Sequence, residues 1–274
     1  MSSVKIPTWL LAVALAVLCG CETVQTTQSG VVGVERKQSM SPLVSSAQMD
    51  RSAADAYAKV LADARSKNQL DRDSAQVERV RRIADRLIPS TAAFRPDAPG
   101  WKWEVNVITT PEVNAWCMPG GKIAVYTGLI TKLNITDDEL AAVMGHEIGH
   151  ALREHGRERA SEELAQQLGI SVLGAALGLG DVGEQLSQKV LEVTVSLPHS
   201  RTQETEADRI GVELAARSGF DPRAAVSLWQ KMGRLGGGKP PEWLSTHPSD
   251  ETRTRDVQNY AERVMPLYEA ARAR

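Results

Sequence analysis

The spacing of apolar residues predicts helices both early in the chain and at its end. Apolar residues recur three or four positions apart over 49–61 and again over 77–87, and Pro89 closes the second segment. A last helix is predicted to start at Ser249 and to be interrupted by Pro266. Helices therefore dominate the expected fold.

Between these helices the period changes to two. In the segment 101–108, WKWEVNVI, large apolar residues alternate with polar ones, which predicts a half-buried strand. Two further short strands, 113–118 and 123–126, flank the turn sequence Pro-Gly-Gly-Lys at 119–122 and predict a hairpin. The pattern favours an α+β fold, mainly helical, with a small antiparallel sheet.

A capped helix follows directly after the predicted hairpin. Thr136 with Glu139 forms a capping-box pattern at its start, and Gly156 is the predicted stop. Gly145 and Gly149 share one face of this helix although glycine there costs about 1 kcal/mol relative to alanine. We therefore expect another element to pack closely against that face.

The N-terminus has the pattern of a lipoprotein signal peptide. Lys5 precedes ten consecutive apolar residues, 9–18, which are too few to span a bilayer. Leu-Cys-Gly-Cys at 18–21 resembles the lipobox of bacterial lipoproteins, so residues 1–20 are expected to be removed and Cys21 to be lipidated. An uncleaved anchor is the alternative. By resemblance to the sorting rule of such proteins, Glu22 implies the periplasmic face of the outer membrane.

The mature chain is expected to have two parts. Residues 21–46 are rich in Thr, Ser, Gln and Gly without a helical period and predict a flexible tether. Such a tether could span at most about 80 Å and on average roughly 25–30 Å. Residues 47–274 form the expected folded domain. Cys117 is the only cysteine of this domain, so no intramolecular disulfide is possible. It is expected to be a small buried apolar residue, and a redox or metal-responsive thiol is the alternative.

Composition excludes some partners and leaves one segment open. The 274 residues carry a net charge of −2 with 42% hydrophobic and 24% charged residues, which is ordinary for a folded domain and argues against nucleic-acid binding. The apolar, glycine-rich segment 168–180 is too short to cross a bilayer. A buried helix or plug is favoured there over membrane contact, but the sequence does not decide between them.

The capped helix carries the first candidate chemistry, His146-Glu147-Ile148-Gly149-His150. Residues four apart lie one turn above each other on a helix, so both imidazoles can reach one zinc ion. Glu147 then lies beside them as a candidate general base for a hydrolase. The alternative from these five residues alone is a core helix with two incidental histidines.

A catalytic zinc needs a third protein ligand and an open position. His155 lies five residues beyond His150, which rotates it about 140° away from the ligand face of a continuous helix, so it cannot join. The metzincin spacing would need glycine at 153 and histidine at 156, where this chain has Arg153 and Gly156. That class is therefore excluded.

The segment 200–208, SRTQETEAD, offers a better third ligand. Ser200 caps a helix on which Glu204 and Asp208 share one face, while Glu206 points roughly the opposite way. Glu204 can complete a site of two histidines and one glutamate. Asp208 is placed to accept the free N–H of a ligand histidine, which fixes the tautomer of that ring.

Four segments together resemble a known family. HEIGH, SRTQETEAD, THPSDETR and VNAWCMPGGKIAVYTGL are similar to motifs of the HtpX and CAAX prenyl protease type of zinc metallopeptidase (metallopeptidase family 48), over roughly 75–260. The lipobox points to the branch of periplasmic lipoproteins that resembles LoiP and the BepA catalytic domain. The resemblance implies a gluzincin fold, one zinc ion on His146, His150 and Glu204, and Glu147 as the general base.

The same resemblance suggests candidates for the remaining roles. His247 and Arg253 are candidate catalytic residues that stabilise the oxyanion, and His247 is alternatively a removable fourth zinc ligand. Asn114, Ala115 and Trp116 lie on a strand edge that could hold an extended substrate, although the strand could equally serve only to cover the core.

These observations predict a zinc-dependent endopeptidase of the bacterial cell envelope that acts on misfolded or misassembled envelope proteins. Its expected partners are protein or peptide substrates, the membrane through the lipid anchor, and the outer-membrane assembly machinery. The alternative is a non-catalytic or chaperone-like lipoprotein, stabilised by zinc, that assists outer-membrane protein assembly.

Overall fold

The computed structural model describes residues 22–171, 189–235, 242–248 and 251–273. The signal peptide, Cys21 and most of the segment 168–180 lie outside these residues. Among the described helices, none combines the length and the apolar character that a membrane crossing requires. The strands are β1 Glu22–Val24, β2 Gln38–Met40, β3 Glu104–Ile108, β4 Ala115–Met118 and β5 Lys122–Tyr126. The helices are α2 Ser46–Ser66, α3 Ser74–Ser90, η1 Thr91–Ala93, η2 Ala98–Gly100, α4 Thr127–Lys132, α5 Asp137–Leu152, α6 His155–Ser171, η3 Glu192–Ser196, α8 Arg201–Arg217, α9 Ala224–Arg234, α10 Glu242–Thr246 and α11 Glu251–Arg272.

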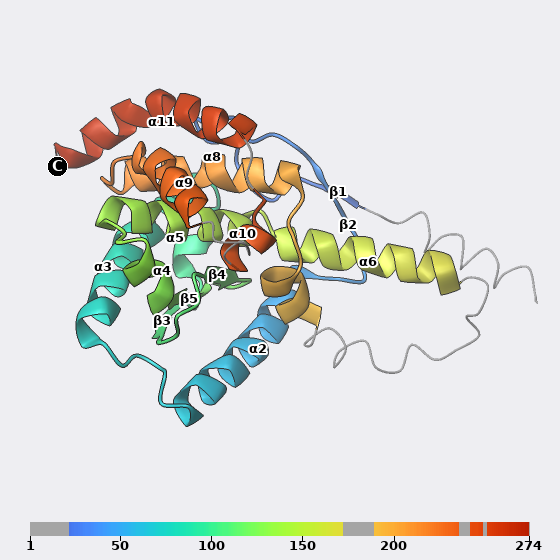
Figure 1. The fold of residues 1–274 in the computed structure, drawn as a ribbon. Coiled ribbons are helices and arrows are strands. Elements are labelled where there is room, and N and C mark those ends of the chain that lie inside the picture. Colours follow the sequence, from blue (N-terminus) through green and yellow to red (C-terminus); the bar gives the residue numbers. More distant parts are fainter. Residues whose placement is uncertain (1–21, 172–188, 236–241, 249–250, 274) are drawn as a thin grey trace, which may run out of the picture.

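The predicted mainly helical α+β fold is confirmed, and the helix pair α5 and α8 lies at its centre (Figure 1). Glycines allow the two helices to approach closely. A Cβ atom at Gly145 would lie 2.9 Å from the carbonyl oxygen of Gly211, and one at Gly149 would lie 3.0 Å from that of Ala207. The close packing predicted for the glycine face is confirmed. It brings the ligand candidates of both helices within reach of each other.

The three-stranded sheet is mixed, with the order β3-β5-β4. The predicted hairpin is present, since β4 and β5 pair antiparallel, but β3 pairs parallel to β5. The expectation of an antiparallel sheet is therefore wrong for β3. After β3 the chain passes the central position and forms β4 at the far edge, so β5 returns between them in the direction of β3. Trp101 and Trp103 precede β3 and stack on each other, with ring centroids 5.5 Å apart.

The predicted helix over 136–156 is two helices. Its capping box at Thr136 is present, but α5 ends at Leu152 and α6 begins at His155. Glu154 lies between them with a φ of +52°, a left-handed conformation that ends the helical path. Gly156 is thus not a stop, and His155 is not on the helix that carries His150.

Two prolines lie inside helices. Pro89 is the second-last residue of α3, close to the predicted end. Pro266 was expected to interrupt the last helix, but α11 continues through it to Arg272. Proline removes one backbone hydrogen bond from a helix interior. Packing of α11 against α8 and α9, with Val264 buried, holds the helix across that position.

The prediction of a flexible tether over 21–46 is wrong for the described residues 22–46. Residues 22–40, here called the strap, begin and end in the antiparallel pair β1–β2 and lie on the folded domain. Val32 and Val34 are buried in the main hydrophobic core, and the amide of Gln28 donates to the carbonyl of Phe94, 2.8 Å away. The polar composition of the segment gave no sign that a few of its residues are buried against the domain.

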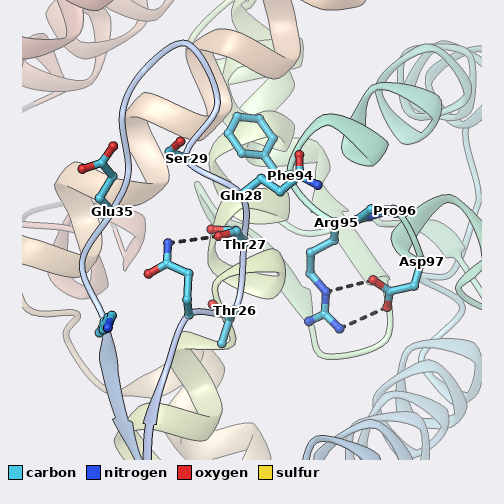
Figure 2. Close-up of a pocket in the computed structure, with 11 residues that line it drawn as sticks. Thr26, Thr27, Gln28, Ser29, Glu35, Phe94, Arg95, Pro96 and Asp97 are labelled. Atoms are coloured by element: carbon cyan, nitrogen blue, oxygen red, sulfur yellow. Dashed lines mark hydrogen bonds and ion pairs between the residues drawn. The ribbon is translucent and has the colours of Figure 1, made fainter.

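The strap also borders a surface hollow. Figure 2 shows Thr26 to Ser29 on one side of it and Phe94 to Asp97 on the other, with Arg95 paired to Asp97. None of the residues that line this hollow is one of the ligand candidates. It is therefore separate from the candidate site.

Candidate active site

Four buried side chains from three parts of the chain converge at the carboxyl half of α5. His146 and His150 come from α5, Glu204 from the first turn of α8, and His247 from the residue after α10. One donor atom of each lies within 4.8 Å of the others. The Nε2 atoms of the two α5 histidines are 3.1 Å apart, and His150 Nε2 is 3.3 Å from Glu204 Oε1.

His247 is a full member of this group. Its Nδ1 atom lies 3.2 Å from His146 Nε2 and 2.9 Å from Glu204 Oε1. Tetrahedral ligands bound at about 2.0–2.2 Å stand roughly 3.3–3.6 Å apart, which is close to the separations among these donors. Three imidazoles and one carboxylate are donors that suit a divalent transition metal. The residues present therefore fit a metal ion.

Asp208 and Arg253 lie behind the donors. Asp208 Oδ1 is 2.9 Å from His146 Nδ1, so this nitrogen donates and Nε2 keeps its lone pair free for a metal. Arg253 donates to both oxygens of Asp208, at 2.8 and 2.9 Å, and pairs with Glu204 at 2.7 Å. Burial opposes the charge on Asp208, but the Arg253 charge and the His146 hydrogen bond hold its pKa below the usual value.

Arg253 was predicted as an oxyanion donor, and its placement argues against that role. Its guanidinium is buried and pairs with two carboxylates, Asp208 and Glu204, the second of which belongs to the donor cluster. A group held in this way orients ligands. It does not present free N–H groups to a substrate.

Glu147 is buried and already has a partner. The indole Nε1 of Trp243 donates to its Oε1, 2.8 Å away, and His247 Nε2 lies 3.5 Å from the same oxygen. Burial raises the pKa of Glu147, which suits a group that must accept and return a proton. Trp243 was not predicted, and its only signal in the sequence is its position four residues before His247.

The predicted substrate edge is in place but is not exposed. β4 is an edge strand of the sheet, yet Asn114, Ala115 and Trp116 are buried, and β4 packs against α5 and η3. The carbonyl of Val113 accepts a hydrogen bond of 3.2 Å from the backbone amide of Trp243. The helix α10 thus covers the start of this edge in the described structure.

Cys117, also on β4, is buried as predicted. Burial raises the pKa of its thiol well above the usual value, so the side chain stays neutral. It behaves as a small apolar residue of the core.

Three polar residues near His150 were not predicted to lie there. His155 Nδ1 is 2.8 Å from His150 Nδ1, and Glu206 Oε2 is 3.1 Å from His155 Nε2. The ring centroids of His199 and His150 are 3.9 Å apart. The assumption of one continuous helix excluded His155. Glu206 points away from Glu204 as expected, but it does not point to solvent.

The fold and the donor cluster together define a metallopeptidase of the HEXXH type. The sequence model of peptidase family M48 matches residues 74–261, and the chain belongs to this family. The resemblance inferred from the four motifs is thus confirmed. The match begins at α3, so the strap and α2 lie outside it.

Relatives of the chain have names that agree with this class. Mitochondrial metalloendopeptidase OMA1 of Arabidopsis thaliana is 39% identical over 176 residues, which cover 64% of this chain and 35% of that protein. OMA1 of Schizosaccharomyces pombe is 38% identical over 161 residues, covering 58% and 47%. The beta-barrel assembly-enhancing protease of Escherichia coli is 31% identical over 172 residues, covering 59% and 35%. The alignments span about a third to a half of the length of these relatives.

Proposed function

We propose that this protein is a zinc-dependent endopeptidase of the bacterial cell envelope that hydrolyses peptide bonds of misfolded or misassembled envelope proteins. The observation that carries the proposal is the arrangement of His146, His150 and Glu204 around one point, with the buried carboxylate of Glu147 beside them on the same helix. Two histidines and a glutamate are the zinc ligands of one class of metallopeptidase.

Each residue has a defined task in this proposal. When bound, zinc would supply Lewis-acid activation of water and of the substrate carbonyl. Glu147 would take a proton from the attacking water and return it to the leaving amine. Asp208 fixes the tautomer of His146, and Arg253 holds Asp208 and Glu204 in place.

The described conformation is proposed to be a resting one. His247 takes a position among the donors that a catalytic site leaves open for water or substrate. Trp243 engages the general base, and its backbone amide bonds to the strand edge at Val113. A substrate strand could reach Glu147 only after α10 moves away. We therefore favour His247 as a removable fourth ligand over a standing oxyanion donor.

Localisation and substrate class rest on the N-terminus and on the names of relatives. The lipobox at 18–21 supports a lipid anchor on Cys21 at the periplasmic face of the outer membrane. One relative is named for enhancing β-barrel assembly and another for its mitochondrial location, so the names alone do not agree on a compartment. The lipobox favours the envelope, with membrane and assembly-machinery proteins as neighbours.

The variant Glu147→Gln tests the proposal. It keeps the size and a hydrogen-bond acceptor for Trp243 but cannot take up a proton. We expect one bound zinc per chain, an unchanged fold, and cleavage of an unstructured protein such as casein reduced by at least about 10²–10⁴-fold. Unchanged cleavage with zinc still bound would contradict the assignment of Glu147.

The closed set of four donors favours a second candidate, a lipoprotein with a structural zinc that assists outer-membrane protein assembly without catalysis. Structural zinc sites typically fill all four positions with protein ligands. Complementation of a deletion strain separates the two functions. Rescue by the Glu147→Gln variant would support the structural candidate, and loss of rescue would support the protease.

A further inference from the structure

A row of buried polar groups lies behind His150, on the side away from the donor cluster. His155 contacts the ring of His150, Glu206 contacts His155, and two arginines contact Glu206. Arg36 comes from the strap and Arg153 from the break between α5 and α6. None of these four residues has a task in the proposed hydrolysis, yet His155 and Arg153 are completely buried. Such a row needs a physical explanation.

The fold turns His155 toward His150 by ending α5 early. On a continuous helix the two rings would point about 140° apart. The left-handed conformation of Glu154 starts a new helix at His155, and the two Nδ1 atoms come to lie 2.8 Å apart. The contact is thus a product of the break and not of sequence spacing.

Glu206 is held as a carboxylate that can only accept hydrogen bonds. Arg36 donates to its two oxygens from Nε at 2.8 Å and from Nη2 at 3.0 Å. Arg153 donates to both oxygens as well, at 3.1 and 3.2 Å. Guanidinium groups are always donors, so the carboxylate accepts from both arginines.

The direction of every hydrogen bond along the row follows from this. Since Glu206 accepts, His155 Nε2 must donate to it across 3.1 Å. The Nδ1 atom of a neutral His155 is then an acceptor, so the hydrogen between the two rings belongs to His150 Nδ1. His150 Nε2 is left without a hydrogen, and its lone pair faces the other donor atoms. This is the tautomer that a metal ligand bound through Nε2 requires.

The other ligand histidine has an equivalent support. His146 Nδ1 donates to Asp208, and Arg253 holds Asp208 with two hydrogen bonds. Both histidines of α5 are therefore backed by a carboxylate that an arginine fixes. For His150 the support is indirect, because the imidazole of His155 lies between His150 and the carboxylate of Glu206.

We propose that His155 and Glu206 are positioning residues that fix the tautomer and the ring orientation of His150. Arg36 of the strap supports them, because it holds the carboxylate of Glu206 in place. The strap lies outside the region 74–261 that the family model matches, so this part of the support is argued from the contacts of Arg36 alone. The proposal rests on the proposed function, since it needs a metal bound at His146, His150 and Glu204.

The experiment measures metal binding by the full chain and does not depend on catalysis. Zn²⁺ affinity is determined by competition with a chromophoric chelator, and ligand geometry by the absorption spectrum of the Co²⁺-substituted protein. The variant His155→Phe keeps a ring but removes both nitrogens. We expect it to bind Zn²⁺ about 10–100-fold more weakly and to show an altered Co²⁺ spectrum, the usual effect of losing such a support.

Rescue by a different residue separates positioning from bulk. His155→Asn restores an oxygen that accepts from His150 and an amide that donates toward Glu206. We expect Asn to recover part of the affinity that Phe loses and to return the Co²⁺ spectrum toward the wild type. A purely structural role would not distinguish these two variants once both are folded.

A matched pair on the strap tests Arg36. Arg36→Met removes the donors to Glu206, while Lys37→Met removes the charge of its exposed neighbour. We expect weaker Zn²⁺ binding for Arg36→Met and wild-type binding for Lys37→Met. This pair, with Glu206→Gln, keeps the proposal testable if His155→Phe does not fold.

Three outcomes decide the matter. Wild-type affinity and spectrum in His155→Phe would overturn the positioning role. A second equivalent of Zn²⁺ in the wild type that is lost with His155 would overturn it too, because His150, His155 and His199 would then bind an ion themselves. The variant His146→Ala reports separately on the proposed function. If it binds Zn²⁺ as the wild type does, the metal site itself is misassigned.

Discussion

Among the described residues around α10, His247 and Trp243 reach the candidate site, and each makes a different contact. The imidazole of His247 lies in the donor cluster, while the indole of Trp243 donates a hydrogen bond to Glu147, the proposed general base. In the proposed mechanism, both contacts are given up before a substrate carbonyl approaches. At the scale of single residues, the ligand candidates and Glu147 are therefore already in contact with other side chains of the protein.

We expect the variant His247→Ala to cleave an unstructured protein faster than the wild type. Removal of the fourth donor weakens the closed state, and a loss of about 1.4 kcal/mol would raise a poorly populated open state roughly tenfold. Initial rates of casein cleavage, measured with zinc content, test this. A lower rate at unchanged zinc content would instead assign His247 to the oxyanion.

Helical periodicity explains which site residues the sequence could reveal. His146 and His150 are one turn apart, as are Glu204 and Asp208, so spacing alone placed each pair on a common face, with Glu147 next to the first pair. His155 and Trp243 could not be found in this way. A helix break brings in the first and a short separate helix the second, and both depend on tertiary structure.

At the scale of elements, the contact between α5 and α8 sets the geometry of the site. It is made through glycines, with little room for adjustment. A Cβ atom at Gly211 would lie 2.6 Å from the amide nitrogen of His146 and 2.9 Å from its Cα atom, both of them backbone atoms. The helices can admit a methyl group there only by moving apart, which separates the ligands on one helix from those on the other.

The variant Gly211→Ala is therefore expected to be destabilised by about 1–3 kcal/mol, although alanine is the better helix former. Urea unfolding of the metal-free protein measures the change. Gly233→Ala on α9 is the matched control, because nothing lies within 4 Å of its added methyl group, and it should gain up to about 1 kcal/mol. Equal stabilities for the two variants would refute the argument.

Elements were predictable where the pattern was local. The capping boxes at Thr136 and Ser200 and the hairpin around Gly120 each follow from a few neighbouring residues. The parallel pairing of β3 with β5 and the continuation of α11 through Pro266 do not, because packing against distant elements decides both.

At the scale of the whole molecule, the strap connects to the end of α5, to α6 and to the start of α8. Arg36 pairs with Glu158 of α6 and with Glu206 of α8, and the side chain of Gln38 donates to the carbonyl of Arg153. The composition of the segment could not predict these contacts, because a few residues are enough to hold an otherwise polar segment on the domain. The strap thereby links helices that are adjacent only in three dimensions.

This link predicts a stability that depends on pH. Burial opposes the charge on Glu158, but hydrogen bonds from Arg36, Gln203 and Gln38 hold its pKa below the ordinary 4.5. A lowered folded pKa contributes stability that is present above about pH 4.5 and is lost as the pH falls through the folded value. Arg36→Met should lose about 1 kcal/mol at pH 7 and less in acid.

Urea unfolding at pH 7 and near pH 3 measures both values, and Lys37→Met serves as the control. The difference between wild type and Arg36→Met should shrink in acid. If the difference in unfolding free energy between the two proteins were the same at both pH values, the contribution of Arg36 would not depend on the ionisation of Glu158.

The folded strap also changes how far an anchored enzyme could search. With Cys21 lipidated, the ordered chain would begin at the very next residue, Glu22 of β1, and one residue spans at most about 3.6 Å. A free tether of the same sequence would have let the domain reach tens of ångströms away from the bilayer. The strap would instead hold it in a thin layer at the bilayer, where encounters occur by diffusion in two dimensions. An enzyme moored in this way would survey chains presented at the membrane surface.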